Sequence, residues 1–322
     1  MSSPDLAFRC PACRGEVQRR EQAFVCAACP REFPILFGIP DFRLRSDRYL
    51  GLDEERAKAR LLDEAAATRT FEQLLAYYYA ITDDVTPERA RRFADYAARG
   101  ADRAALALDR FGEFGPGAAM LDVGCGAGGG LIAASRRFDC VVGIDIALRW
   151  LVICRKRLKE AGVKATLVCA DAASPPFAPS QFSHVLAMDV IEHLEDIDAA
   201  LDALHGQLRA GGAMWISANN RRWIGPHPAI GIWAAAYRPA WSRSEREGGQ
   251  VYDPLRFTAM LSPAMVRRAC ERAGFGGFCA WPRRIEGGGA RAIYAKIADN
   301  RTMGPLLTAI GPAFEAVMQT KR

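Results

Sequence analysis

The chain has 322 residues, a formal net charge of +6, and 50% apolar and 25% charged residues. These fractions are those of ordinary globular proteins, so most of the chain is expected to fold. No apolar run reaches the ~20 residues that a membrane-spanning helix needs, which excludes a helical integral membrane protein. The mild positive charge permits an anionic partner without requiring one.

Two C-x-x-C pairs stand near the start of the chain, Cys10-Pro-Ala-Cys13 and Cys26-Ala-Ala-Cys29. Their spacing predicts a structural zinc site of four thiolates, with Glu16 to Val25 forming the hairpin between the pairs. Two disulfides in a secreted domain are the alternative, which the absence of a signal peptide disfavours. The other six cysteines stand mostly in apolar segments and are expected to be buried free thiols of a cytoplasmic protein, at positions 125, 140, 154, 169, 270 and 279.

A segment rich in Ala, Leu, Arg and Glu, from about Asp53 to Phe111, follows the cysteine module. Its apolar residues recur at helical intervals, so it is predicted to form helices. Thr86-Pro-Glu88 offers an N-cap followed by proline at the first helical turn.

The stretch Leu121-Asp-Val-Gly-Cys-Gly-Ala-Gly-Gly129 places a glycine-rich turn directly after the apolar run Ala118 to Val123. Such a turn between a strand and a helix lets backbone N–H groups face a ligand, and glycine tolerates the positive φ angles involved. A nucleotide-like cofactor is therefore expected. The dinucleotide pattern G-x-G-x-x-G is also satisfied, so two cofactor classes compete at this turn.

Further alternating elements follow. Cys140 to Ile144 reads as a strand that ends in Asp145, an acid suited to ribose hydroxyls, and Ala165 to Asp171 reads as another strand that ends in an acid. Phe182 to Leu194 reads as a fourth strand running into a helix. The remaining predictions are a helix 196–208, a turn 209–212, a strand 213–217, a helix 255–273 restarting at Ser262-Pro263, closing strands 275–280 and 290–297, and a terminal helix 303–318.

This order of motifs resembles the class I S-adenosylmethionine (SAM) dependent methyltransferases, specifically the type 11 and ubiquinone-pathway enzymes, over roughly Ala118 to Tyr294. The resemblance implies an α/β fold, with a doubly wound, seven-stranded, mostly parallel Rossmann-like sheet. It also implies that SAM binds where the motifs meet. The cofactor-binding residues so implied are Asp122, Gly124, Cys125, Gly126, Gly128, Asp145, Ile146, Asp171, Ala172 and Met188.

Each of these positions has an implied role. Gly124, Gly126 and Gly128 pass close to the methionine part of SAM, and Asp122 lies near its amino group. Asp145 holds the ribose diol, Ile146 packs on the adenine, Asp171 accepts from the adenine amine beside Ala172, and Met188 lines the pocket. For the carboxylates, a helix N-cap or a solvated strand end stays open as an alternative. Tyr77, Tyr78 and Tyr79 are candidates for the roof of the pocket, or for core packing.

The cysteine module and its continuation, Arg31 to Phe42, resemble the zinc ribbons of small methyltransferase activator proteins. Similar ribbons precede some bacterial methyltransferases, and ribosomal RNA guanine methyltransferases carry a comparable one. The predicted organisation is therefore a zinc ribbon 1–48, a helical cap 49–112, a methyltransferase domain 113–298 and a tail 299–322.

The segment Asp189-Val-Ile-Glu192-His193 carries the candidate catalytic groups. On a helix, positions i, i+3 and i+4 share a face, so the three side chains are expected to converge. His193 is the best candidate base because the unperturbed pKa of a histidine side chain lies close to neutral pH. The trio also resembles the Glu-x-x-Glu-His segment of ubiquinone-pathway O-methyltransferases, with Asp189 in place of the first Glu, so a divalent metal site and structural capping stay open.

An insert, 219–252, mixes aromatic and guanidinium side chains and is expected to select the acceptor. It suits a lid over a small or lipid-like molecule, a surface for RNA, or a peripheral membrane contact. We predict a SAM-dependent methyltransferase acting on oxygen or nitrogen of a small or lipid-like acceptor. An RNA base methyltransferase is the main alternative, and an NAD-dependent oxidoreductase or a non-catalytic scaffold is less favoured. Nothing in the sequence sets the oligomeric state.

Overall fold

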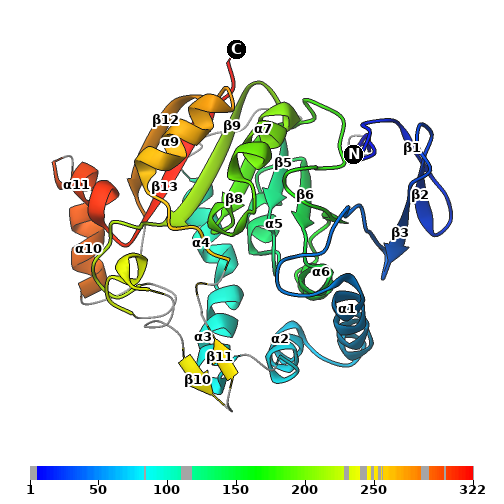
Figure 1. Cartoon of the computed structure of the whole chain (residues 1–322), viewed down its shortest axis with the longest axis horizontal. Coiled ribbons are helices and arrows are strands. Elements are labelled where there is room, and N and C mark those ends of the chain that lie inside the picture. Colours follow the sequence, from blue (N-terminus) through cyan, green and yellow to red (C-terminus); the bar gives the residue numbers. More distant parts are fainter. Residues whose placement is uncertain are drawn as a thin grey trace. The chain divides into compact units, whose positions relative to one another are not determined.

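The computed structural model describes residues 6–82, 85–109, 118–227, 232–239, 245–247, 250–252, 255, 257–283, 290–300 and 302–321, with the backbone alone for 245–247, 250–252 and 290–292. The chain divides into two compact units. The first comprises Met1–Leu186 and Ala203–Ala213, and the second comprises Ala187–Asp202 and Met214–Arg322. Figure 1 labels the elements of both units.

The cysteine module forms a small antiparallel sheet in the order β1-β2-β3-β4. Its first hairpin pairs Val17 with Cys26 and Arg19 with Phe24, which confirms the predicted hairpin between the two cysteine pairs. Aromatic rings of Phe8, Phe24 and Phe42 pack at centroid distances of 5.1–5.4 Å and give the module a core of its own. The strands are β1 Val17–Arg19, β2 Ala23–Cys26, β3 Glu32–Leu36 and β4 Ile39–Pro40.

The segment after the ribbon is helical, as predicted. Thr86 caps its third helix by accepting a hydrogen bond from Arg89 N, and Pro87 is the first helical residue, because proline needs no N–H there. Residues 110–117, where the predicted cap and the methyltransferase domain meet, lie outside the described residues. The helices are α1 Leu52–Ala66, α2 Phe71–Ala80, α3 Pro87–Ala98 and α4 Gly100–Leu108.

Seven strands follow the order β12-β13-β9-β8-β5-β6-β7. β5 pairs in parallel with β6 and with β8, and β6 pairs in parallel with β7, whereas β12 and β13 are antiparallel. The predicted α/β class and the mostly parallel sheet are confirmed. These strands are β5 Ala119–Val123, β6 Cys140–Asp145, β7 Thr166–Cys169, β8 Phe182–Met188, β9 Leu208–Asn219, β12 Gly276–Pro282 and β13 Ala313–Gln319.

The core of the first unit follows from strands that are buried on both faces. Every residue of β5 is buried, and five of the six residues of β6 are, as expected for central parallel strands.

Helices alternate with the strands along the chain. They are α5 Gly129–Ala134, α6 Leu148–Glu160, η1 Ile191–His193, α7 Ile197–Gln207, η2 Ala235–Tyr237, α9 Pro263–Arg272, α10 Ala290–Ala298 and α11 Met303–Ile310, with the hairpin β10 Glu245–Glu247 and β11 Gln250–Tyr252 in the insert.

Four predictions of local structure were wrong. Residues 290–297 form helix α10 rather than a strand, and the antiparallel partner of β12 is β13, which begins within the predicted terminal helix. The predicted turn 209–212 belongs to β9, and the helix predicted over 255–273 spans only Pro263–Arg272, where Ser262 caps it. Apolar runs of this length suit either a strand or a buried helix, and long-range pairing decides between them.

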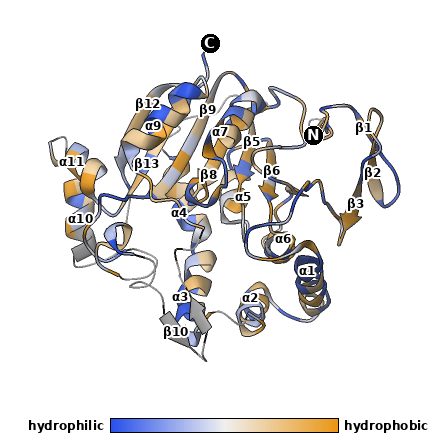
Figure 2. Cartoon of the chain, viewed as in Figure 1, coloured by the Kyte–Doolittle hydropathy of each residue, from blue (hydrophilic) through white to orange (hydrophobic). Residues whose placement is uncertain are grey.

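Helices α10 and α11 leave several large apolar side chains exposed, which Figure 2 shows as hydrophobic colouring on both helices. These side chains are Ile293, Ile297, Met303, Leu306 and Ile310. Among the described residues, no helix is both long and apolar enough to cross a membrane.

Candidate functional site

The glycine turn after β5 needs backbone angles that other residues rarely adopt. Gly124, Gly126 and Gly128 have φ angles of +63°, +47° and +77°. Cys125 N donates to Ile144 O at 3.0 Å and so joins the turn to the end of β6. The turn is therefore a fixed loop at the carboxyl end of two parallel strands, where open α/β sheets bind ligands.

Asp122 lies buried directly below this turn, with an exposed fraction of 3%. Its Oδ2 has no hydrogen-bond partner among the described residues, and a Cβ at Gly130 would collide with that oxygen. Burial, and then the charge of Asp145, raise the pKa of Asp122 to about 8. A buried carboxyl of this kind suits a cationic ligand group, which would restore its charge.

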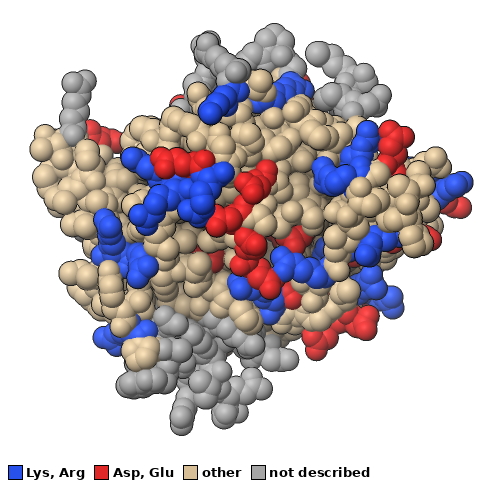
Figure 3. All heavy atoms as spheres, turned by 45° about the horizontal axis from the view of Figure 1, so that its top comes forward, with Lys and Arg blue, Asp and Glu red and all other residues tan. Residues whose placement is uncertain are grey.

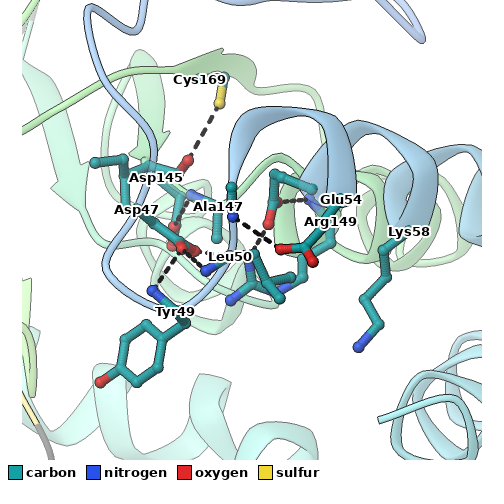
Figure 4. A network of polar contacts seen from close by, with 12 residues as sticks. Asp47, Tyr49, Leu50, Glu54, Lys58, Asp145, Ala147, Arg149 and Cys169 are labelled. Atoms are coloured by element: carbon teal, nitrogen blue, oxygen red, sulfur yellow. Dashed lines mark hydrogen bonds and ion pairs between the residues drawn. The ribbon is translucent and has the colours of Figure 1, made fainter.

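Asp145 ends β6 and accepts two backbone hydrogen bonds, from Gly126 N to Oδ2 at 2.9 Å and from Ala147 N to Oδ1 at 2.8 Å (Figure 4). Burial raises its pKa to about 6, although these two bonds oppose the shift. The carboxylate thus holds the glycine turn, and it does not cap α6, whose N-cap is Ala147 without a side-chain cap bond. Each oxygen has a second lone pair, so a ribose contact stays a prediction.

Asp171 and the residues around it face the extended segment that follows the ribbon. Arg45 Nε donates to Asp171 Oδ2 at 2.7 Å, and Ala173 N donates to Oδ1 at 3.0 Å. Arg43 Nη1 donates to the carbonyl of the half-buried Ile146 at 3.1 Å. Sequence reasoning missed both arginines. Their one sequence signal is the alternation of basic and apolar residues at 43–45, which is typical of an extended segment.

The same segment continues the sheet edge beside β7. Phe42 N donates to Cys169 O at 2.8 Å, and Asp41 forms a parallel bridge with Cys169, the last residue of β7. Asp41 and Arg43 are themselves joined by a buried ion pair of 2.7 Å. The ribbon is therefore fixed by backbone and side-chain bonds to the strand ends that carry the predicted adenine contacts.

A buried guanidinium joins this segment to the helical cap. Arg149 Nη1 pairs with Asp47 at 2.7 Å and with Glu55 of α1, and Arg149 N donates to Glu55 Oε1 at 2.8 Å (Figure 4). Tyr78 packs against Trp150 with ring centroids 4.8 Å apart and is buried, which supports its core-packing alternative. Tyr77 and Tyr79 are half-buried.

The four cysteine sulfurs lie within 4.8 Å of one another. Cys10 and Cys29 are 3.8 Å apart, and Cys13 and Cys26 are 3.5 Å apart. Four Zn–S bonds of about 2.3 Å at tetrahedral angles would separate the sulfurs by about 3.8 Å. The donor set and its spacing therefore fit Zn²⁺.

In the second unit, the segment 189–193 differs from the single helical face that was expected. β8 ends at Met188, which is half-buried, Asp189 has a φ of +53°, and only Ile191–His193 form a short 3₁₀ turn. Glu192 is 1% exposed, whereas His193 is exposed. The prediction of convergence on one helix face was wrong, because Asp189 lies outside the 3₁₀ turn and no α-helix forms over 189–193.

Asp189 is held by an arginine 94 residues away. Arg283 donates to it twice, Nη1 to Oδ1 at 2.8 Å and Nη2 to Oδ2 at 2.6 Å. Ser217 Oγ also donates to Oδ1 at 3.0 Å. No local sequence signal connects these residues, so sequence reasoning missed Arg283. Within the described residues, the grouped candidate metal ligands are the four cysteines, and the trio 189, 192 and 193 forms no such group.

Glu192 is buried between polar neighbours that satisfy it only in part. Its Oε1 lies 3.4 Å from both the backbone and the side-chain nitrogen of Asn219, and its Oε2 has no partner among the described residues. Burial, and then the charge of Asp189, raise its pKa to about 8. The raised pKa favours the protonated form of Glu192, which is able to donate a hydrogen bond.

The insert is described only in part. Trp233 and Tyr237 are 63% and 59% exposed, whereas Ala235 and Leu255 form a small buried cluster with Ile232 and Met260. Trp241 and Arg243 lie outside the described residues, as does the side chain of Arg246.

Residues 121–216 match the family described as "Methyltransferase domain". Phosphoethanolamine N-methyltransferase 2 of Caenorhabditis elegans is 34% identical over 114 residues, which cover 34% of this chain and 26% of that protein. A ubiquinone biosynthesis O-methyltransferase of Nitrobacter winogradskyi is 29% identical over 192 residues, which cover 60% and 68%. The match therefore spans about a quarter of the first relative and two thirds of the second.

Among solved structures, a Haemonchus contortus phosphoethanolamine N-methyltransferase 2 has a TM-score of 0.48 and 20% identity, covering 68% of this chain and 52% of that one. The sheet order, the glycine turn above a buried carboxyl and the family match agree with one another. The chain therefore carries a class I SAM-dependent methyltransferase domain.

Proposed function

We propose that the chain transfers a methyl group from SAM to an oxygen or nitrogen of a small or lipid-like acceptor. The observation that carries this proposal is the buried Asp122 carboxyl, whose Oδ2 has no partner among the described residues and which directly precedes three glycines of positive φ. SAM would supply a methyl group on a cationic sulfonium, and its transfer is an in-line displacement in which positioning accounts for much of the acceleration.

The residues of the first unit would bind and orient the cofactor. Asp122 would accept from the cofactor's amino group, and the glycine turn would approach its methionine part. Asp145 would hold the ribose while it fixes Gly126 N. Ile146 and Ala172 would flank the adenine, and Arg45 would orient Asp171 toward the adenine amine.

The residues of the second unit would act on the proton of the acceptor. His193 is exposed and would remove it from a hydroxyl or a protonated amine. Glu192, whose raised pKa favours the neutral form, would donate a hydrogen bond rather than act as a base. Asp189 would act as an anchor for this segment, because both of its oxygens already accept from Arg283.

We also propose that the cysteine module binds one structural Zn²⁺ through Cys10, Cys13, Cys26 and Cys29. Four protein thiolates leave no coordination position for substrate. The bonds from 41–45 to Cys169, Ile146 and Asp171 support a bracing role for the ribbon at the adenine side.

The names of the two curated relatives cover one nitrogen and one oxygen acceptor, which supports both atoms as candidates here. Titration calorimetry with S-adenosylhomocysteine and with NAD tests the cofactor, and binding of NAD alone would refute the proposal. Transfer of labelled methyl from SAM to hydroxylated aromatic and amine acceptors then tests the reaction. Transfer only to RNA, with a steep loss of binding at higher salt, would favour the RNA alternative.

A further inference from the structure

The second unit contains a cavity whose described lining is basic. It has a volume of about 380 Å³ and is lined by Arg221, Arg222 and Arg268 together with Tyr237, Ser262 and Met265. Pockets for small molecules range upward from roughly 300 Å³, so one small ligand would fit. None of the described lining residues is acidic.

The three arginines lack carboxylate partners within the described part of the chain. Among the described residues, the one polar contact made by any of these three guanidinium groups is from Arg221 Nη1 to Met265 Sδ at 3.6 Å. Elsewhere on the molecule, basic side chains commonly lie beside acidic ones, as Figure 3 shows for the face in view. Three like charges around one cavity repel one another, and an oxyanion bound between them would relieve that repulsion.

The cavity is held in shape by the backbone. Arg221 N donates to Leu261 O at 2.6 Å, and Asn220 bridges in parallel to Leu261. Asn220 is 5% exposed, and its Nδ2 donates to the carbonyls of Thr308 and Ala309 at 3.2 and 3.1 Å. These bonds fix the loop that presents Arg221 and Arg222, so the site is arranged before any ligand arrives.

Two chain segments connect the cavity to Glu192. Asn219, which contacts Glu192 Oε1, directly precedes the loop of Arg221. Ala259 N donates to the backbone carbonyl of Glu192 at 2.6 Å, and Ser262 of the cavity follows three residues later. An anionic group bound here would therefore be tethered close to the 189–193 segment.

We infer that this cavity binds a compact dianionic oxyanion, best matched by the phosphate of a phosphomonoester acceptor. Guanidinium groups donate paired hydrogen bonds that match phosphate oxygens, and the hydroxyls of Tyr237 and Ser262 add further donors. The amino end of α9, which begins at Pro263, contributes a favourable dipole. The identification of the ligand as an acceptor rests on the proposed function, whereas the anion site itself does not.

The test is titration calorimetry of the full chain with inorganic phosphate, comparing the wild type with the double variant Arg222→Gln/Arg268→Gln. Arg267→Gln is the matched control, because this exposed arginine lies on the same helix and is not among the described lining residues. We expect saturable binding to the wild type and the control, and at least tenfold weaker binding to the double variant.

Equal phosphate binding by wild type and double variant, or none by the wild type, would overturn the inference. The inference would also be overturned if a single-stranded RNA bound through Arg222 and Arg268 while inorganic phosphate did not bind, because the ligand would then be a polyanion. S-adenosylhomocysteine is titrated in parallel. Its binding should be the same in all three chains, and its failure to bind any of them would count against the methyltransferase proposal alone.

Discussion

Arg283 and Asp189 form a two-bond ion pair that joins the segment after β12 to the end of β8, with Nη1–Oδ1 at 2.8 Å and Nη2–Oδ2 at 2.6 Å. Both side chains are largely buried, with 13% and 19% exposed. Asp189 adopts a left-handed backbone conformation that costs a non-glycine residue free energy. The pair therefore stabilises the path of the chain through the candidate catalytic segment.

Replacing Arg283 by Met should lower the free energy of unfolding by about 3 kcal/mol, because it removes both guanidinium hydrogen bonds from the largely buried Asp189 carboxylate. Lys at this position should recover part of the loss, since it restores the charge but not the paired geometry. Urea unfolding curves of the three chains measure both effects. Equal stability of the Met variant and the wild type would show that the pair is not stabilising.

Replacing His193 by Ala should reduce turnover roughly 100-fold or more while leaving SAM affinity nearly unchanged, because a general base acts on the acceptor and not on the cofactor. Steady-state methyl transfer and calorimetry with S-adenosylhomocysteine separate the two quantities. Unchanged values of both would rule out the catalytic assignment.

Replacing Asp122 by Asn should weaken S-adenosylhomocysteine binding by roughly 10- to 100-fold, because a charged hydrogen bond to the amino group would be lost. The same change should alter how stability depends on pH. Between pH 4 and about pH 8 the unfolded chain releases the Asp122 proton while the folded chain retains it, so this group lowers stability as pH rises through that range.

The Asn variant lacks this titration. Its melting temperature relative to the wild type should therefore increase from pH 4 to pH 8 and level off above it. Thermal melts without cofactor at several pH values provide the measurement. A difference that stays constant with pH would contradict the raised pKa of Asp122.

Replacing Arg45 by Gln should weaken S-adenosylhomocysteine binding two- to fivefold, an effect of roughly 0.5–1 kcal/mol, because Arg45 is 42% exposed and its pair with Asp171 is partly screened by water. The matched control is Arg31→Gln, an exposed ribbon arginine with the same change in charge. If the two variants bind S-adenosylhomocysteine with equal affinity, Arg45 does not contribute to the cofactor site.

Removing the metal with a chelator, or replacing Cys13 by Ser, should lower both the melting temperature and the affinity for S-adenosylhomocysteine. The proposed Zn²⁺ would stabilise the fold of the ribbon, whose continuation is bonded to Cys169, Ile146 and Asp171. Cys279→Ser, at an exposed cysteine outside the cluster, is the control. Metal analysis should find one Zn²⁺ per chain, and a chelated protein of unchanged stability would refute a structural role.

The residues that sequence reasoning located well are those whose chemistry depends on near neighbours. The glycine turn, the Asp122 and Asp145 strand ends and the two C-x-x-C pairs are each defined by short spacings. The hairpin 16–26 and the Thr86 cap also follow from local patterns. The expectation that the remaining cysteines are buried was met at five of six positions, with Cys279 exposed.

The sequence by itself determined the fold class, the glycine turn and the grouping of the four cysteines, because glycine conformations, strand periodicity and ligand spacing are properties of adjacent residues. Only the tertiary structure decided that Arg45 contacts Asp171, that Arg283 holds Asp189 and that β13 rather than 290–297 pairs with β12. These contacts join residues tens of positions apart or more. Their partners are selected by packing and burial, which no spacing along the chain records.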